Sequence, residues 1–241
     1  MKKLLLGLLL ISSVLSFGAT QRVGIEKLVT NESRDTLYLE ETKKPYSGEV
    51  ERKYPDGKLL GIATVKDGKF NGKSYEYYEN GKLKIEENYV NGKSEGVSKV
   101  FYPNGKVKYE TPYKNDKKEG VEKFYSENGI LMSEIPFKND IVIGVAKVYN
   151  AQTGKLEYEE NLVNGKRNGL SKKYYPSGKV LNEVNFKDDK EEGIMRVYYE
   201  TGKLQGEIPY KNGQVDGVVK AYDENGKLIE QATFKNGEEV K

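Results

Sequence analysis

Two series of glycines recur along this chain at a fixed interval. One series, here called the turn glycines, is Gly57, Gly81, Gly105, Gly129, Gly154, Gly178, Gly202 and Gly226. The other, the start glycines, is Gly48, Gly72, Gly96, Gly120, Gly144, Gly169, Gly193 and Gly217. Every step is 24 residues except one step of 25, which both series take in the same unit. A period of this length is typical of stacked repeats. The sequence therefore predicts eight tandem units over 48–241, after a divergent segment at 20–47.

Each unit has the pattern of a β-hairpin. A run rich in β-branched and aromatic residues follows the start glycine, as in 97–102, and the turn Pro103-Asn104-Gly105 comes next. A second such run closes on Asn-Gly, Asn-Asp or Asp-Asp, whose residues tolerate the positive φ of a tight turn. Turn signals every ten to fourteen residues leave no room for helices. The predicted fold is all-β, an elongated single-sheet meander of about sixteen antiparallel strands built from stacked β-hairpin repeats.

Aligned units show columns of apolar residues. Five residues after the start glycine lie Tyr77, Phe101, Tyr125, Tyr149, Tyr174, Tyr198 and Tyr222, and two residues after each turn glycine lies Leu or Val. A three-residue loop with a G1 bulge would pair Phe101 with Val107, so that both columns share one face. A third column, Val65, Tyr89, Tyr113, Phe137, Leu162, Phe186, Tyr210 and Phe234, joins that face if the alternation stays strict.

Charged residues form two further columns. The basic column is Lys99, Lys123, Lys147, Lys172, Arg196 and Lys220, and the acidic column is Glu86, Glu110, Glu134, Glu159, Glu183 and Glu207. Strict alternation places the basic column on the aromatic face and the acidic column on the opposite face. The aromatic and basic columns are the candidate binding residues, as a track of rings beside cations. The alternative is that tyrosine rings and lysine stems simply cover a sheet that has no second layer.

The composition excludes several classes of site. The chain has no His and no Cys, so it cannot form a Ser-His-Asp triad, a thiol nucleophile, a disulfide or an ordinary zinc site. Near-identical units offer no unique desolvated pocket for a glycosidase acid, and Asp67, Asp116, Asp140 and Asp188 fall in separate hairpins, too far apart for calcium. We expect no catalytic residues, no metal, no cofactor and no enzymatic activity.

The N-terminus predicts export. Lys2 and Lys3 precede an apolar stretch from Leu4 to Leu15, and small residues follow up to Ala19. This pattern is typical of a signal peptide at 1–19, although a retained membrane anchor is an alternative. We expect an exported chain that is periplasmic, on the cell surface or secreted. Removing Lys2 and Lys3 lowers the formal net charge from +3 to +1, so we expect neither a nucleic-acid partner nor stable membrane insertion of the mature chain.

The repeat itself resembles a known family. The unit Gly-x-x-x-x-Tyr-Tyr-x-x-Gly-Lys-Leu-x-x-Glu-x-x-Tyr-x-Asn-Gly is similar to the bacterial variant of the MORN repeat, of the YwqK type. The resemblance covers the eight units. It implies a meandering sheet of stacked hairpins and a role in protein interaction, and some relatives are described as antitoxin components of toxin–antitoxin modules.

Three functions remain open from the sequence. The leading hypothesis is an exported, non-enzymatic scaffold that binds a protein or polysaccharide partner at the cell envelope or on another cell. The second is an antitoxin or immunity protein that neutralises a partner toxin. The third is a structural component of the envelope, which would fractionate with it irrespective of protein partners.

Overall fold

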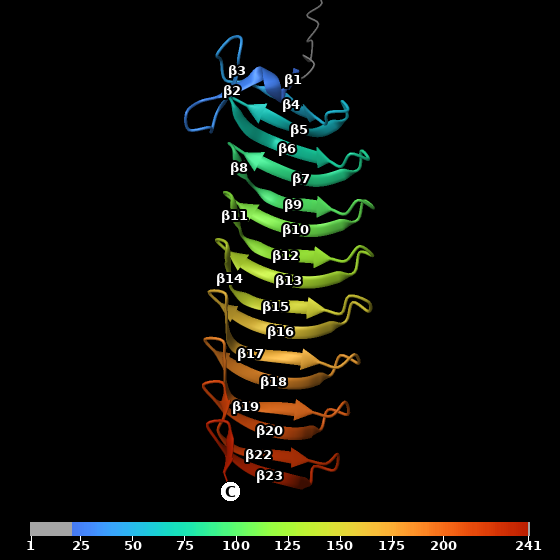
Figure 1. The fold of residues 1–241 in the computed structure, drawn as a ribbon, viewed down its shortest axis with the longest axis vertical. Coiled ribbons are helices and arrows are strands. Elements are labelled where there is room, and N and C mark those ends of the chain that lie inside the picture. The colour runs from blue at the N-terminus through green and yellow to red at the C-terminus, as the bar shows by residue number, and fades with distance from the viewer. Residues whose placement is uncertain (1–20, 241) are drawn as a thin grey trace, which may run out of the picture.

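A computed structural model describes residues 21–240 of the chain. One 22-stranded sheet runs the length of the molecule, and its strands stack along the long axis (Figure 1). Almost all neighbouring strands are antiparallel and consecutive in the sequence. The prediction of an all-β, elongated, single-sheet fold is therefore confirmed. The predicted signal peptide at 1–19 lies outside the described residues.

Each of the eight units forms a hairpin, numbered here 1 to 8 in chain order. Hairpins 1 to 4 are β4 (Gly48–Lys53) with β5 (Leu59–Lys66), β6 (Lys69–Tyr77) with β7 (Leu83–Val90), β9 (Gly96–Phe101) with β10 (Val107–Lys114), and β12 (Gly120–Tyr125) with β13 (Leu131–Lys138). Hairpins 5 to 8 are β15 (Gly144–Tyr149) with β16 (Leu156–Val163), β17 (Lys166–Tyr174) with β18 (Val180–Lys187), β19 (Lys190–Tyr198) with β20 (Leu204–Lys211), and β22 (Gly217–Tyr222) with β23 (Leu228–Lys235).

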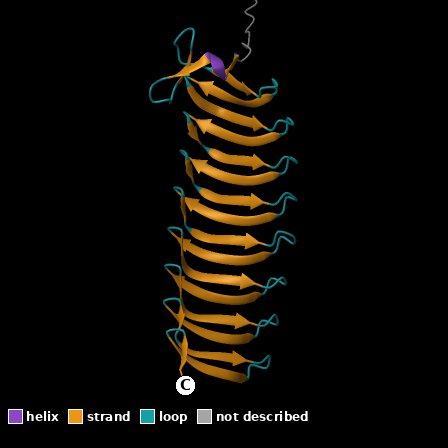
Figure 2. Ribbon diagram, viewed as in Figure 1, coloured by secondary structure: helices purple, strands orange, loops and turns teal. Residues whose placement is uncertain are grey.

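Short strands account for the difference between the 22 strands of this sheet and the sixteen that the sequence predicts. In four hairpins the chain before the start glycine is a separate strand, namely β8 (Lys93–Ser94), β11 (Lys117–Lys118), β14 (Ile141–Val142) or β21 (Gln214–Val215), and β24 (Glu238–Val240) follows the last hairpin. In β6, β17 and β19 the same segment is continuous with the long strand. These segments and their turns form a column along one edge of the sheet, opposite the longer loops (Figure 2).

The two-residue turns between hairpins have positive φ at both positions. Asn91 and Gly92 have φ of 51° and 83°, and Asn115 and Asp116 have 50° and 69°. These are the values of a type I′ turn, whose twist matches that of the flanking strands. The Asp residues tolerate this conformation with help from a neighbour, because Asp116 Oδ1 accepts a hydrogen bond of 2.7 Å from the Ser94 backbone N–H of the preceding turn. The predicted αL positions are confirmed.

The divergent N-terminal segment covers one end of the sheet. It contains β1 (Arg22–Gly24), the short 3-10 helix η1 (Ile25–Lys27), and a two-stranded hairpin of β2 (Leu28–Thr30) and β3 (Leu37–Leu39). Strand β1 pairs with β4 in parallel. Val23 and Tyr46 pack with Val50 and Val65 in a small buried cluster. The Tyr46 hydroxyl donates to Gln21 O at 2.8 Å and Glu49 O at 3.0 Å, which fixes this segment on hairpin 1.

A β-bulge in each hairpin decides which side chains share a face. Phe101 pairs with Val107 as predicted, but Val100 then pairs with Tyr109, so Lys108 is an extra residue in β10. Beyond the bulge Lys99 lies opposite Glu110, and the alternation of β10 is shifted by one residue. The prediction that strict alternation continues along this strand is therefore wrong.

The bulge defines two faces, named here for use below. The ladder face carries Phe101, Lys99 and Glu110 with their equivalents in the other hairpins. The groove face carries Val100, Tyr109 and Tyr113 with their equivalents. The acidic column thus lies with the basic column, and the third aromatic column lies on the opposite face from Tyr125. Both placements correct the expectation from the sequence.

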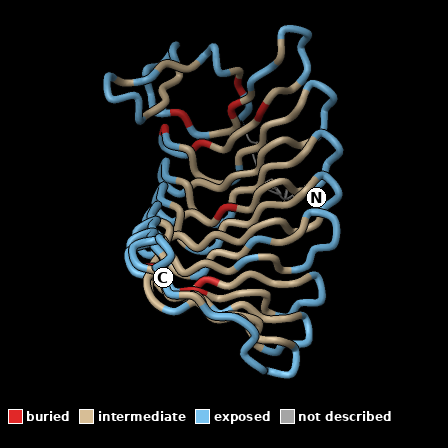
Figure 3. Tube along the Cα trace, turned by 60° about the horizontal axis from the view of Figure 1, so that its bottom comes forward, coloured by how far each residue is buried: buried red, intermediate tan, exposed pale blue. Residues whose placement is uncertain are grey.

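The groove face is the inner side of the curved sheet. By the strand register, Thr111, Ser171, Val184 and Phe186, which are buried, belong to this face. Figure 3 marks the buried positions along the curved trace of the chain. A single-layer sheet has no second layer to bury them, so their burial comes from curvature. The strands bend at the start glycines, where φ is positive, as at Gly120 with +123°.

Candidate functional site

The thirteen residues predicted as a binding track lie together on the ladder face. Tyr77, Phe101, Tyr125, Tyr149, Tyr174, Tyr198 and Tyr222 form one row along the sheet, and Lys99, Lys123, Lys147, Lys172, Arg196 and Lys220 form the next. Their grouping on one face agrees with the sequence. The glutamates, however, occupy the same row as the cations and alternate with them.

The charged row is a continuous ladder across the hairpins. Within a hairpin Lys99 pairs with Glu110, and between hairpins Glu110 pairs with Lys123. The Lys99 Nζ to Glu110 Oε1 distance is 3.0 Å, and equivalent ion pairs at 3.6 to 3.9 Å join Lys123 to Glu134, Lys147 to Glu159 and Arg196 to Glu207. These cations are more than a third exposed, so each pair contributes little by itself.

Tyrosine hydroxyls connect the aromatic row to this ladder. The Tyr149 hydroxyl donates to Glu134 Oε2 of the preceding hairpin at 2.8 Å, and the Tyr174 hydroxyl donates to Glu159 at 2.6 Å. Tyr125, Tyr198 and Tyr222 make the same bond at 2.8 to 3.3 Å. Burial, with the hydrogen bond to Glu134, raises the pKa of Tyr149 from 10.0 to about 12.

The charged ladder also lowers the pKa of one of its glutamates, Glu110. A hydrogen bond from Lys99 lowers the pKa of Glu110, and the Tyr125 hydroxyl lowers it further. Glu110 is thus bonded to groups from two hairpins. Most polar atoms of the predicted binding track are engaged in such bonds, which supports the alternative that these columns hold and cover the sheet. Their role in binding stays a prediction.

A second set of tyrosines, which the sequence argument missed, links hairpins at the loop edge. The Tyr102 hydroxyl, at the start of the loop of hairpin 3, donates to Tyr125 O of hairpin 4 at 2.8 Å. Tyr54, Tyr78, Tyr175 and Tyr199 make the same bond at 2.6 to 2.8 Å. The sequence signal is a tyrosine directly after the first aromatic column, as in Phe101-Tyr102 and Tyr174-Tyr175. Adjacent residues of a strand point to opposite faces and cannot have one role.

The groove face carries an apolar row near the loops. This row contains Ile85, Val100, Tyr109, Phe124, Val148 and Tyr158, and its one polar member is Ser133, between Phe124 and Val148. Tyr109 and Phe124 stack with their ring centroids 4.7 Å apart, although they belong to different hairpins. Val148 and Tyr158 are 43% and 38% exposed. Apolar side chains gathered in one row over hairpins 2 to 5, interrupted only at Ser133, are typical of interaction sites.

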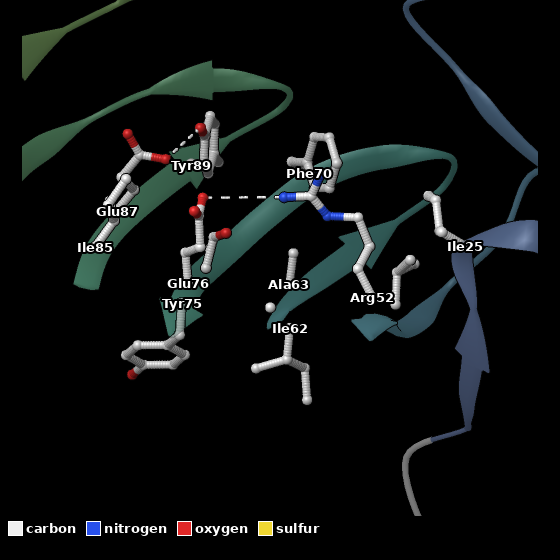
Figure 4. A pocket seen from close by; sticks show the side chains of 13 residues that line it. Ile25, Arg52, Ile62, Ala63, Phe70, Tyr75, Glu76, Ile85, Glu87 and Tyr89 are labelled. Carbon is white, nitrogen blue, oxygen red and sulfur yellow. Dashed lines mark hydrogen bonds and ion pairs between the residues drawn. The ribbon is translucent and has the colours of Figure 1, made fainter. Parts of the chain in front are cut away.

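A pocket of about 350 Å³ lies at the capped end of the groove face. Ala63 lies in its floor and Ile25 of η1 at its side (Figure 4). Arg52 reaches across it to Glu76 at 4.0 Å, while Glu87 accepts a hydrogen bond of 2.7 Å from the Tyr89 hydroxyl. The groove therefore ends in a polar rim of both charges.

Two further properties concern the described residues only. Within residues 21–240 no three acidic side chains come close enough to hold a metal ion together. In the same range there is no helix with the length and apolar character needed to span a bilayer.

Comparisons with known proteins agree with the repeat pattern. The profile of the family described as MORN repeat variant matches residues 46–67, 70–91, 94–115, 118–139, 167–188, 191–212 and 215–236. These stretches make up more than half of the chain, and they omit 140–166, which covers most of the 25-residue unit. No curated protein matches the chain. The assignment to the YwqK type stays a prediction. The seven matches show that the chain belongs to the MORN repeat variant family.

Proposed function

We propose that this chain is an exported, non-enzymatic scaffold that binds a segment of a partner protein along its groove face. MORN repeats are in general protein- or membrane-interaction repeats, and the family is a non-catalytic scaffold. The observation that carries the proposal is the row from Ile85 to Tyr158, which is apolar except at Ser133, lies on the inner side of the sheet and has Val148 and Tyr158 exposed to solvent. The signal-like sequence at 1–19 supports export.

The groove face suits a protein segment better than the ladder face does. Apolar side chains bind by losing contact with water, and a concave surface buries more of a ligand than a flat one. On the ladder face, a ligand would first have to displace the Tyr-Glu and Lys-Glu bonds. An antitoxin role, in which the partner is a toxin, is one form of the same proposal.

Site-specific photo-crosslinking can distinguish the two faces. Val148 on the groove face and Val145 on the ladder face are each 43% exposed and lie on the same strand, β15. We expect benzoylphenylalanine at Val148 to yield a defined adduct with a partner protein in the producing cells, while the same residue at Val145 does not. Blots of envelope, periplasm and medium fractions would show where the adduct forms. An adduct from Val145 alone would instead support the ladder face.

A further inference from the structure

The loop of hairpin 5 departs from those of the other hairpins. It is one residue longer, and Asn150 stands where Tyr102 begins the loop of hairpin 3. The two residues have the same place in the backbone, since Tyr102 N–H donates to Lys106 O and Asn150 N–H donates to Lys155 O, each at 2.8 Å. Hairpin 5 therefore lacks the tyrosine ring that connects hairpins 1, 2, 3, 6 and 7 to the hairpin that follows each of them.

The acceptor for that missing ring is left without its donor. In hairpins 1, 2, 3, 6 and 7 the loop tyrosine donates to a backbone carbonyl of the next hairpin. The corresponding oxygen beyond hairpin 5 is Tyr174 O, and no side chain among residues 21–240 donates to it. Asn150 does not replace the ring, because its Nδ2 donates to Glu157 Oε1 at 2.7 Å and its Oδ1 accepts from Gln152 and Thr153 N–H at 3.0 and 2.9 Å.

A pocket of about 310 Å³ occupies this place. Leu156, Tyr158 and Tyr175 supply its apolar sides, with Pro176 from the next loop. Lys155 closes one side, where its Nζ donates to Pro176 O at 2.5 Å. Tyr158 also belongs to the apolar row of the groove face, so the pocket adjoins that row.

Hairpin 4 lacks the tyrosine as well, but its loop is built differently. Ser126 stands in the place of the tyrosine, and Ile130 replaces the lysine that follows the turn glycine in the other seven units. Ile130 Cγ2 would lie 3.4 Å from a Cβ placed on Gly154, so this side chain lies against the loop of hairpin 5.

We infer that the pocket at Asn150 binds the phenol ring of a tyrosine side chain from the partner protein. The repeat defines the occupant, because five other hairpins seat a tyrosine ring at the equivalent place. Leu156, Tyr158 and Pro176 would cover the ring, and its hydroxyl would donate to Tyr174 O. The inference rests on the proposed function, and it adds a chemical requirement to the segment that lies on the groove face.

The test uses two small probes and the full chain. N-acetyltyrosinamide and N-acetylphenylalaninamide are titrated by NMR, with the backbone amides of Leu156 and Tyr175 as reporters. The tyrosine probe should bind about two- to tenfold more tightly, as expected for one hydrogen bond. Equal affinity of the two probes would overturn the inference, as would a cello-oligosaccharide that shifts the same amides while the tyrosine probe does not.

Two reciprocal variants make the assignment specific. Asn150→Tyr supplies the ring from the chain itself, so probe binding at this pocket should be lost. Tyr102→Asn removes a ring from hairpin 3 and should create a second probe site, reported by the amide of Ser126. Because Asn150→Tyr also removes the loop hydrogen bonds of Asn150, circular dichroism must show that it folds. If Asn150→Tyr does not fold, the Tyr102→Asn variant is the test of the inference. Absence of a new probe site at hairpin 3 of that variant would contradict it.

Failure of this inference can be told apart from failure of the proposed function. The probe titration needs no partner protein, and the crosslink from Val148 needs no tyrosine. A crosslink without probe binding leaves the groove as the interaction face and removes the tyrosine requirement. Probe binding without a crosslink from Val148 would leave a phenol pocket on a chain whose groove is not the interaction face.

Discussion

Single tyrosine residues join neighbouring hairpins on both sides of the sheet. Tyr149 and its equivalents donate to glutamates of the preceding hairpin, while Tyr102 and its equivalents donate to carbonyls of the next hairpin. The rings also cover the backbone, so each tyrosine combines apolar contact with one directional bond. A chain with few purely aliphatic residues can thus hold a single-layer sheet together.

This arrangement predicts a loss of stability at alkaline pH. The pKa of Tyr149 is about 12 in the folded chain, against about 10 for an ordinary tyrosine. Because the unfolded chain loses the proton first, the stabilisation is complete below pH 10 and disappears as the pH rises to about 12. The folded-state pKa values of Tyr125 and Tyr174 are raised in the same direction.

Urea unfolding at pH 8 and pH 11 measures the effect. The triple variant Tyr125→Phe, Tyr149→Phe, Tyr174→Phe should be less stable than the natural chain at pH 8 but should lose less stability between the two pH values. Lysines that titrate in this range are common to both proteins, so the difference isolates the tyrosines. An equal decline in the two proteins would contradict the assigned hydrogen bonds.

At the scale of one hairpin, the β-bulge is the feature that sequence reasoning could not supply. The turns were predictable because Gly, Asn and Asp are the residues that tolerate positive φ, and the pairing of Phe101 with Val107 followed from the loop length. The bulge residues are Leu60, Lys84, Lys108, Met132, Glu157, Leu181, Gln205 and Ile229, with no shared chemistry. Without a marker for the extra residue, the acidic column and the third aromatic column were assigned to the wrong faces.

Inserting one residue beyond the bulge tests the register. Deletion of Lys108 itself would leave Glu110 opposite Lys99, whereas an extra residue between Tyr109 and Glu110 should shift the rest of β10 by one residue, moving Glu110 onto the groove face and Tyr113 off it. We expect a loss of about 3 kcal/mol or more, because a carboxylate loses its partners in an apolar row. Inserting one residue between Asn104 and Gly105, as in the natural loop of hairpin 5, should cost less than about 1 kcal/mol. Similar melting temperatures for the two variants would disprove this account.

At the scale of the whole molecule, each hairpin pairs only with its neighbours in the sequence. The stability of such an array is a sum of repeat and interface contributions. Deleting residues 120–143, one whole unit, should leave a soluble, β-rich and shorter chain, because Glu119 then joins Gly144 in the same register. Deleting 120–131 should not, because it removes one strand and reverses the direction of all that follow. Circular dichroism and gel filtration measure both, and aggregation of the first variant would indicate a closed fold.

The direction of the strands has a mechanical consequence. The two long strands of each hairpin cross the long axis of the molecule, so the hydrogen bonds between them point along that axis (Figure 1). Tension applied at the two ends of the sheet therefore pulls on a few bonds of one seam at a time and peels them apart, whereas strands parallel to the load would shear together. Under such a load the molecule yields gradually, one hairpin after another, and each released hairpin lengthens the tether while the remaining ones stay folded.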